Sequence, residues 1–389
     1  MNWMVTFERL GTIQRTVLNR LSAQDKSAWI KGFAGSGKTV LLIHFIMEQK
    51  KLNPGKTICC VVYTHALKDL VQTGLEIGSN IPVMTYFQFL KEKKRYDLVI
   101  VDEVQDVPQS DLMDIKKYSS RLILGGDTDQ SIYEKGASAE QINEVVHPEI
   151  HELNIIYRLT DKLRRIVQTI LPNSHIENAA IHKGANIDIT LAKATTYENE
   201  VNWVCSTARR YSAAGDPAAI LLQTHKTIQK FIRHIGTMQR LQIPEIKKHK
   251  KDDYKNKNRD EFYDAVNNIM RVKGLPYRYL GNDIGALTDS DNQEIVYIMT
   301  YHSVKGLDFE TVFLPEMNAS RRAFNTDEAL DRRLFFVACT RSRSNLFFSY
   351  HENLHKYISQ MPQENLNRIE CAKALNVDRA KQENQADLF

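Results

Sequence analysis

The stretch GFAGSGKT at residues 32–39 decides the fold. It satisfies the spacing G-x-x-x-x-G-K-[ST], in which small residues let successive backbone N–H groups surround an anion at the N-terminus of a helix. A strand-like run at 27–30 precedes the loop and an apolar run at 40–47 follows it as the start of a helix, which is the context that the pattern requires. The sequence therefore predicts an α/β domain whose expected ligand is a nucleoside triphosphate.

A second stretch, VDEVQDV at 101–107, supports the same ligand. The apolar run at 98–101 predicts a buried strand that ends at Asp102 and Glu103. At a strand end of this kind one carboxylate can hold Mg²⁺ and the other can orient water. The pair therefore suits the nucleotide that the first stretch predicts.

Composition sets broad limits on the protein. The chain has 389 residues, of which 42% are hydrophobic and 25% charged, as is ordinary for a globular protein of two or three domains. A formal net charge of +5 permits a polyanionic partner. Five cysteines without a C-x-x-C pair favour neither a disulfide framework nor a zinc site. No leader-like segment and no run of about eighteen apolar residues is present, so the expected compartment is the cytoplasm.

Two successive α/β patterns predict two domains. Apolar runs at 57–63, 98–101 and 121–124 indicate strands that are buried on both faces of a parallel sheet. A second alternation begins near residue 187, with strands expected at 187–192, 218–223, 295–300 and 311–314 and helices expected at 198–211 and 227–235. Between these elements, KKHKKDDYKNKNR at 247–259 is too polar to pack, and predicts either a solvated loop or a contact with phosphate backbone.

Several further blocks, in order along the chain, resemble those of the superfamily 1 DNA helicases of the UvrD/Rep/PcrA kind. VDEVQDV resembles the DExxQD box of that family, LILGGDTDQSIY at 122–133 its GDxxQSIY segment, and NIIYRLT at 154–160 its NYRS segment. MTYHSVKGLDFETVFL at 299–314 is similar to the THxxKGLEF block, and RRLFFVACTRSR at 332–343 to the RRLxYVAxTRA block. The resemblance extends from Gln14 to Arg343 and implies two RecA-like P-loop domains, with parallel sheets flanked by helices and ATP in the cleft between them. We expect an N-terminal domain at 1–152, a C-terminal domain at 153–352 and a polar tail at 353–389.

The blocks assign roles in ATP hydrolysis. Lys38 should reach the β and γ phosphates, Thr39 and Asp102 should share Mg²⁺, and Glu103 is then the base or water-orienting group. Resemblance implies that Gln130 senses the γ-phosphate, and that Arg158 and Arg341 neutralise transition-state charge when the two halves close. The expected catalytic residues are Lys38, Asp102, Glu103, Gln130, Arg158 and Arg341.

A wider set is expected to bind the nucleotide. Gln14 can hydrogen-bond an adenine edge, as a glutamine does there in the family, and Tyr157 either stacks on the adenine or packs in the core. Asp308 stands where the family has Glu, which keeps the charge and shortens the reach. The expected ATP-binding residues are Gln14, Gly32, Ala34, Gly35, Ser36, Gly37, Lys38, Thr39, Val40, Tyr157, Gly306 and Asp308.

The chain departs from the family at several points. Fewer than about ten residues separate Phe89 from the strand at 98, too few for the accessory domain that the family inserts there, and the second accessory domain is also absent or vestigial. Glu134, Lys135 and Gly136 stand where the family has a Trp that stacks on DNA, a contact worth about 1–3 kcal/mol per base. Other aromatic residues can substitute for it. The expected nucleic-acid contacts are Tyr63, Thr64, Tyr86, Phe87 and His302.

The chain ends in QADLF, which resembles the peptide by which bacterial DNA-replication and repair proteins dock on the sliding clamp, with Gln385, Leu388 and Phe389 as its anchors. An uninformative terminus is the alternative. Three functions are compatible with these observations, of which an RNA-directed superfamily 1 helicase fits least well, because the blocks match the UvrD kind better. The first is a DNA-stimulated ATPase or helicase that moves on or remodels single-stranded DNA, with 3′-to-5′ polarity by resemblance. The second is an ATP-operated switch that recruits or activates a partner, a nuclease or the clamp, in DNA repair or phage defence.

Overall fold

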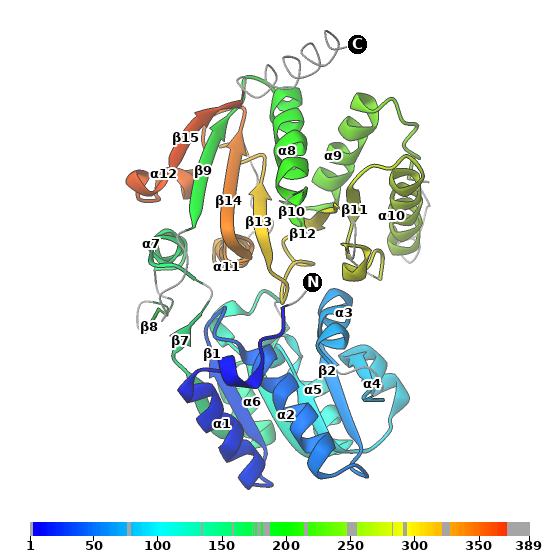
Figure 1. The fold of residues 1–389 in the computed structure, drawn as a ribbon, viewed down its shortest axis with the longest axis vertical. Coiled ribbons are helices and arrows are strands. Elements are labelled where there is room, and N and C mark those ends of the chain that lie inside the picture. The colour runs from blue at the N-terminus through cyan, green and yellow to red at the C-terminus, as the bar shows by residue number, and fades with distance from the viewer. Residues whose placement is uncertain are drawn as a thin grey trace. The chain divides into compact units, whose positions relative to one another are not determined.

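The computed structural model describes residues 3–75, 79–133, 135–157, 159–172, 174, 176, 180–181, 187–213, 217–246, 255–281, 283–290, 294–320 and 327–371. The chain forms two compact units (Figure 1). Unit 1 comprises Met1–Arg164, Leu171–Ala185 and Lys305–Leu307, and unit 2 comprises Arg165–Ile170, Asn186–Val304 and Asp308–Phe389. Both units are α/β with parallel sheets, which confirms the predicted fold class.

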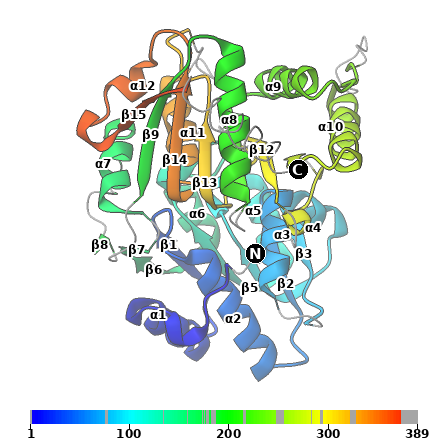
Figure 2. The ribbon, with the colours of Figure 1, turned by 45° about the horizontal axis from the view of Figure 1, so that its top comes forward.

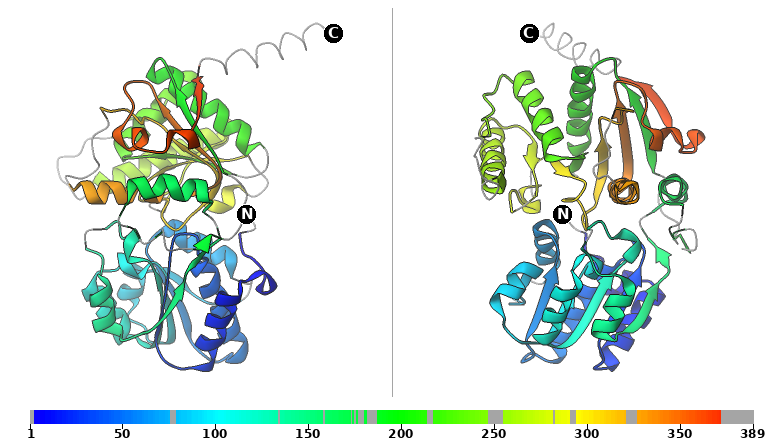
Figure 3. Two further views of the ribbon diagram at one scale, coloured as in Figure 1. Left: turned by 90° about the vertical axis from the view of Figure 1, so that its left-hand side faces the viewer. Right: turned by 180° about the vertical axis from the view of Figure 1, so that it is seen from behind.

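Unit 1 is built on a six-stranded parallel sheet in the order β3-β2-β4-β5-β1-β6. Its strands are β1 (Ala28–Gly32), β2 (Ile58–Val62), β3 (Val83–Thr85), β4 (Tyr96–Val101), β5 (Ser119–Gly126) and β6 (Glu149–Leu153). Its helices are α1 (Thr12–Ala23), α2 (Lys38–Leu52), α3 (His65–Gly74), α4 (Tyr86–Glu92), α5 (Gln109–Lys117) and α6 (Ala139–Val146), with short 3-10 turns η1 (Phe7–Arg9), η2 (Val104–Asp106) and η3 (Thr128–Gln130). Helices α1, α2 and α3 cover one face of the sheet, and α4, α5 and α6 cover the other, as the front and rear views show (Figures 1 and 3). The central strands are therefore shielded from water on both sides, which explains their uninterrupted apolar runs.

Unit 2 contains a seven-stranded sheet in the order β11-β12-β10-β13-β14-β9-β15. Its strands are β9 (Asp188–Lys193), β10 (Ala218–Leu222), β11 (Tyr277–Tyr279), β12 (Val296–Thr300), β13 (Phe309–Leu314), β14 (Ser342–Tyr350) and β15 (Asn367–Glu370). Its helices are α8 (Tyr197–Ser212), α9 (His225–Met238), α10 (Lys255–Val272), α11 (Glu328–Cys339) and α12 (Lys356–Ser359), with 3-10 turns η6 (Leu287–Ser290) and η7 (Gln363–Asn365). Helices α8, α9 and α10 pack on one face through a core that includes Trp203, Phe231 and Tyr263, and α11 lies on the other face (Figures 2 and 3). In the sequence, the residues between β6 and β9 form helix α7 (Asp161–Ile170) and a small two-stranded sheet of β7 (Ile155–Ile156) and β8 (Ala180–Ile181).

Two segments differ from the sequence prediction. The tail expected from residue 353 contributes structure to unit 2. Its strand β15 pairs in parallel with β9, and Tyr357, Ile358 and Met361, which precede this strand, are buried. Of the polar segment 247–259, expected as a solvated loop or a phosphate-backbone contact, residues 247–254 lie outside the described residues, and the remainder belongs to α10, which begins at Lys255. Among the described residues, no helix has both the length and the apolar character needed to cross a membrane.

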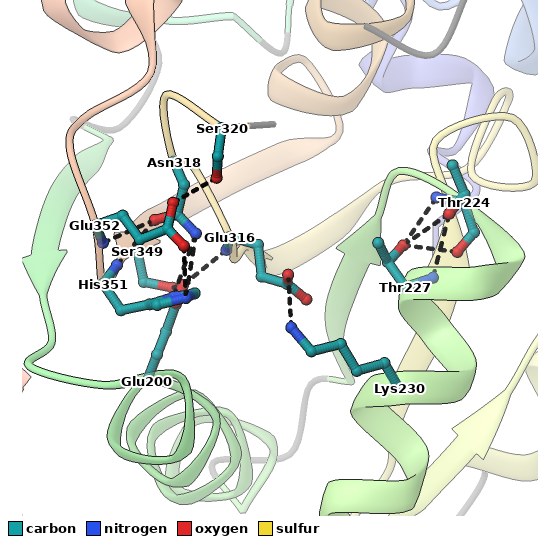
Figure 4. A network of polar contacts seen from close by, with 10 residues as sticks. All are labelled: Glu200, Thr224, Thr227, Lys230, Glu316, Asn318, Ser320, Ser349, His351 and Glu352. Carbon is teal, nitrogen blue, oxygen red and sulfur yellow. Dashed lines mark hydrogen bonds and ion pairs between the residues drawn. The ribbon is translucent and has the colours of Figure 1, made fainter. Parts of the chain in front are cut away.

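A buried acid organises the carboxyl edge of the unit 2 sheet (Figure 4). Glu200 in the first turns of α8 is 0% exposed and accepts hydrogen bonds of 2.7 Å from both the Glu316 backbone N–H and the Ser349 hydroxyl. It also forms a short ion pair with His351 Nδ1. Asn318, which follows β13, also binds the residue after β14, because its Oδ1 accepts a hydrogen bond of 3.0 Å from the His351 backbone N–H. One carboxylate thus connects α8 to the residues that follow β13 and β14.

This ion pair makes the stability of unit 2 depend on pH. The hydrogen bond that His351 donates to Glu200, the largest cause, raises the pKa of His351 above its ordinary value of 6.5. Because the folded state holds the proton more tightly than the unfolded state, the stabilisation is complete below pH 6.5 and is lost as pH rises through the raised pKa. We expect the difference in unfolding free energy between wild type and His351→Gln to shrink as pH rises from about 6 to about 9 in urea titrations.

The control is His44→Gln, which removes a histidine from α2 in unit 1. A difference for His351→Gln that stays constant with pH, or that grows as pH rises, would contradict the assignment of this ion pair.

Candidate nucleotide-binding and catalytic site

The predicted catalytic carboxylates and the glycine-rich loop lie at one edge of unit 1. Strands β1, β4 and β5 are parallel and in register, with Leu124 paired to both Trp29 and Val101. Parallel strands deliver their carboxyl ends to the same edge, which is where open α/β sheets bind ligands. The loop after β1, Asp102 after β4 and Gln130 after β5 therefore meet there because of strand order.

The loop at 32–39 takes the shape that its glycines allow. Gly35 and Gly37 have φ of 77° and 83°, a left-handed backbone that other residues adopt only with strain. Gly37 is the N-cap of α2, so the loop leads directly into a helix N-terminus. Lys38 is 7% exposed, and its ammonium donates to the carbonyls of Gly32 and Phe33 at 2.7 and 3.1 Å. Val40 lies in the first turn of the same helix, as expected.

The donor set suits a nucleotide with Mg²⁺. The Thr39 hydroxyl donates to Asp102 Oδ2 at 2.6 Å, so a hydroxyl and a carboxylate oxygen, both ligands that Mg²⁺ accepts, lie side by side. Ser36 Oγ is buried and has no hydrogen-bond partner among the described residues, as expected of a loop that surrounds a polar ligand. Thr39 and Asp102 would hold the ion, which neutralises phosphate charge when bound. Burial, followed by the charge of Glu103, raises the pKa of Asp102, so a cation beside it would favour the ionised form.

Glu103 is held in a strained and crowded position. Its φ is 55°, unusual for a residue with a side chain, and it is 8% exposed. Gln105 Nε2 donates to Glu103 Oε2 at 2.5 Å, while Gln105 Oε1 accepts from the Asp127 backbone N–H at 3.1 Å. Gln130 Nε2 donates to Asp127 Oδ2 at 2.6 Å. Gln105 thus joins the loops after β4 and β5. Gln105 was not predicted as a site residue, although its place in VDEVQDV was the available signal.

Gln14 and Tyr157 approach the same loop from outside the sheet. Gln14 is 5% exposed; its amide donates to the Ser36 carbonyl at 3.0 Å and accepts from the Gly11 backbone N–H at 2.9 Å. The Tyr157 backbone N–H donates to the Gly35 carbonyl at 3.0 Å. A Cβ on Gly11 would lie 1.8 Å from the Tyr157 hydroxyl, so the two residues are in close contact. The predicted adenine-side residues therefore converge on the loop, where Gln14 also ties it to α1.

Four aromatic rings form a row in unit 1. The Tyr63 and Tyr86 rings stack with centroids 5.2 Å apart, and Phe87 and Tyr133 flank them at 4.0 Å from Tyr86 and 4.3 Å from Tyr63. Phe87 is 66% exposed, whereas Tyr86 is 4% exposed. Thr64 caps α3 by accepting from the Leu67 backbone N–H at 3.1 Å. Tyr133 was not predicted as part of this group; its position just before the missing Trp was the signal.

The remaining predicted residues are distributed as follows. Gly306 belongs to unit 1 with φ of 85°. His302, Asp308 and Arg341 belong to unit 2, where the Arg343 guanidinium lies 3.5 Å from Asp308 Oδ2. Arg341 is 3% exposed, and its Nε donates to the Val337 carbonyl at 2.9 Å, at the end of α11. Arg158 and the tail residues Gln385, Leu388 and Phe389 lie outside the described residues.

These features define a P-loop nucleotide-binding domain followed by a second parallel α/β domain. Residues 14–136 match a family model described as "AAA domain", and residues 228–353 match one described as "UvrD-like helicase C-terminal domain". The chain is 36% identical over 123 residues to "ATP-dependent DNA helicase Rep" of Buchnera aphidicola subsp. Schizaphis graminum (strain Sg). That match covers 28% of this chain and 18% of the relative, so the chain spans less than a fifth of it.

The similarity of this chain to a solved structure is weaker than its sequence similarity to the Rep relative. The C-terminal domain of a possible DNA helicase from Lactobacillus plantarum WCFS1 has a TM-score of 0.35 and 14% identity, covering 55% of this chain and 98% of that one. The two family matches and the Rep relative show that the chain is similar to an AAA domain in its first α/β part, to the C-terminal domain of UvrD-like helicases in its second, and to a Rep helicase over 123 residues.

The contact between Gly126 and Gln105 offers a test of the loop arrangement. A Cβ on Gly126 would lie 2.3 Å from Gln105 Oε1 and 2.9 Å from Val104 Cγ1. Gly126→Ala must displace Gln105 from both Glu103 and the Asp127 backbone, so we expect it to lower the unfolding free energy by about 1–3 kcal/mol in urea titrations.

Gly55→Ala is the matched control, because a Cβ there meets no atom within 4 Å. It should leave stability unchanged or raise it slightly. Equal stability of Gly126→Ala and wild type would show that Gln105 does not occupy this position.

Proposed function

We propose that this protein is a DNA-stimulated ATPase that couples ATP hydrolysis to movement on, or remodelling of, single-stranded DNA. The observation that carries the proposal is the Thr39–Asp102 contact of 2.6 Å, with Lys38 and Glu103 on the same two loops. A phosphate-binding loop, a metal-binding pair and a carboxylate able to orient water are what hydrolysis of a phosphoanhydride requires.

In this proposal, the second domain supplies the positive charge that stabilises the transition state at the γ-phosphate. Resemblance assigns Arg341, and Arg158 with it, to the γ-phosphate, where an arginine stabilises the charge of the transition state. Arg341 is already oriented by α11, because its guanidinium bonds the Val337 carbonyl and the Thr340 hydroxyl at 2.9 and 3.0 Å. Hydrolysis would then depend on both domains, which would couple it to their relative motion.

The row of Phe87, Tyr86, Tyr63 and Tyr133 supports single-stranded DNA as the partner. Successive bases stack on aromatic side chains without regard to sequence. Phe87 offers an exposed ring at one end of the row, and the stacked rings behind it hold it in place. This surface would replace the Trp that the family has after QSIY.

A second candidate is the ATP-operated switch that recruits or activates a nuclease or a sliding clamp. The short connection between α4, which ends at Glu92, and β4, which starts at Tyr96, supports it, because no accessory domain for duplex separation fits there. Clamp docking through Gln385, Leu388 and Phe389 rests on the sequence alone.

Titration of ATPase activity with single-stranded DNA, duplex DNA and RNA distinguishes the DNA-stimulated ATPase from the ATP-operated switch. We expect single-stranded DNA to stimulate hydrolysis most, Lys38→Ala to abolish it, and Arg341→Ala to lower the rate by about 10³-fold or more. Arg210→Ala, on the exposed side of α8, is the matched control and should retain the rate. Hydrolysis that is equally fast without DNA would favour the switch, and its absence under every condition would refute both.

The aromatic row gives a separate prediction. Phe87→Ala should weaken binding of an oligo-dT strand by about 1–3 kcal/mol in fluorescence anisotropy at fixed salt, while Phe87→Tyr should retain affinity. The control is Phe7→Ala, since Phe7 is also exposed, at 44%, but contacts only a histidine ring among the described aromatic pairs. Equal losses for the two alanine variants, or none for Phe87→Ala, would exclude this row as the stacking surface.

A further inference from the structure

Three residues of unit 1 come from a distant part of the chain. Lys305–Leu307 pack with unit 1, although Val304 before them and Asp308 after them belong to unit 2. The segment lies between the end of β12 at Thr300 and the start of β13 at Phe309. Gly306 allows the close approach, because its φ is 85° and a Cβ there would lie 3.0 Å from Leu67 Cδ1. Unit 2 thus holds both ends of a segment that is packed into unit 1.

Lys305 is the charged residue of this segment, and it is 2% exposed. Its ammonium lies 2.6 Å from Asp106 Oδ2 and 3.8 Å from Glu103 Oε2. It also donates to the Gln130 carbonyl at 2.6 Å. One buried cation therefore contacts the loop after β4 twice and the loop after β5 once, beside the carboxylate that we assign to water orientation.

The three contacts limit where Glu103 can lie. Gln105 Nε2 holds Glu103 Oε2 from one side at 2.5 Å, and the Lys305 ammonium lies near the same oxygen. Asp106 is 1% exposed, so its charge needs the ammonium beside it. Without that cation, the carboxylates of Asp106, the last residue of η2, and Glu103, its N-cap, would repel each other.

We propose that Lys305 is a positioning residue for ATP hydrolysis, which fixes the Glu103 carboxylate and the Gln130 loop from a segment that unit 2 holds at both ends. The inference rests on the proposed ATPase activity. It adds a connection through the backbone between β12 and β13 of unit 2 and the carboxylate of Glu103. A displacement of β12 or β13 would pull on the segment and thereby on the ammonium. Lys305 would then make the geometry of the catalytic carboxylate sensitive to the movement of unit 2.

A purely structural ion pair is the competing interpretation, and a double variant separates the two. Replacing a buried pair by apolar residues of similar size is often neutral for stability, whereas removing one partner is strongly destabilising. Lys305→Met should therefore lower the melting temperature, and Lys305→Met combined with Asp106→Leu should recover it. The double variant folds without an ammonium beside Glu103.

The measurement is kcat and KM for ATP with saturating single-stranded DNA, on the full chain. We expect the double variant to lose at least about tenfold in kcat, since general-base catalysis depends on position. KM should change by less than about threefold, because the phosphate-binding loop is untouched. Lys305→Arg, which keeps the charge, should retain more activity than Lys305→Met. The control is Lys116→Met, which removes another lysine that donates to a backbone carbonyl of unit 1.

The outcomes distinguish this inference from the proposed function. Wild-type hydrolysis that Lys38→Ala abolishes, together with wild-type kcat in the stable double variant, would overturn the role of Lys305 alone. A wild-type protein without ATPase activity would overturn both. If Lys305→Met does not fold, the double variant decides the question.

Discussion

The contact between the Thr39 hydroxyl and the Asp102 carboxylate, at 2.6 Å, is the interaction on which the site depends. The two residues are distant in sequence and meet because β1 and β4 are parallel strands of one sheet that end at the same edge. The same order brings in the loop after β5. Hydrogen bonds from Gln105 to Glu103 and from the Asp127 backbone to Gln105 then fix these loops relative to each other. Strand order therefore brings together the loops whose side chains carry the chemistry of the site.

The two units use polar groups in different ways. In unit 1, buried charges gather around the phosphate-binding loop, and Asp106 carries a pKa raised to about 7, mainly by burial. In unit 2, the buried Glu200 is fully bonded and joins α8 to the segments after β13 and β14. The first arrangement is costly for stability and suits a site that binds charge. The second stabilises the edge of a sheet. Lys305 belongs to the first arrangement but is connected through the backbone to the second unit.

The sequence predicted the central elements well and the edges poorly. Strands such as β2 and β12 are buried along their whole length, so their apolar runs were visible without a structure. Edge strands β3, β11 and β15 are short, and in β15 three of four residues are exposed, which leaves no periodic signal. Motif spacing placed Lys38, Thr39 and Asp102 in one site. It could not show that Lys305 contacts Asp106, or that Tyr133 completes the aromatic row, since both depend on loop conformation.

The most direct test is a crystal structure of the protein with Mg²⁺ and a non-hydrolysable ATP analogue. We predict that the phosphates lie in the loop at 32–39, that Mg²⁺ is bound by Thr39 and Asp102, and that Arg341 reaches the γ-phosphate. Phosphates bound away from this loop, or Mg²⁺ held without Thr39 and Asp102, would contradict the account.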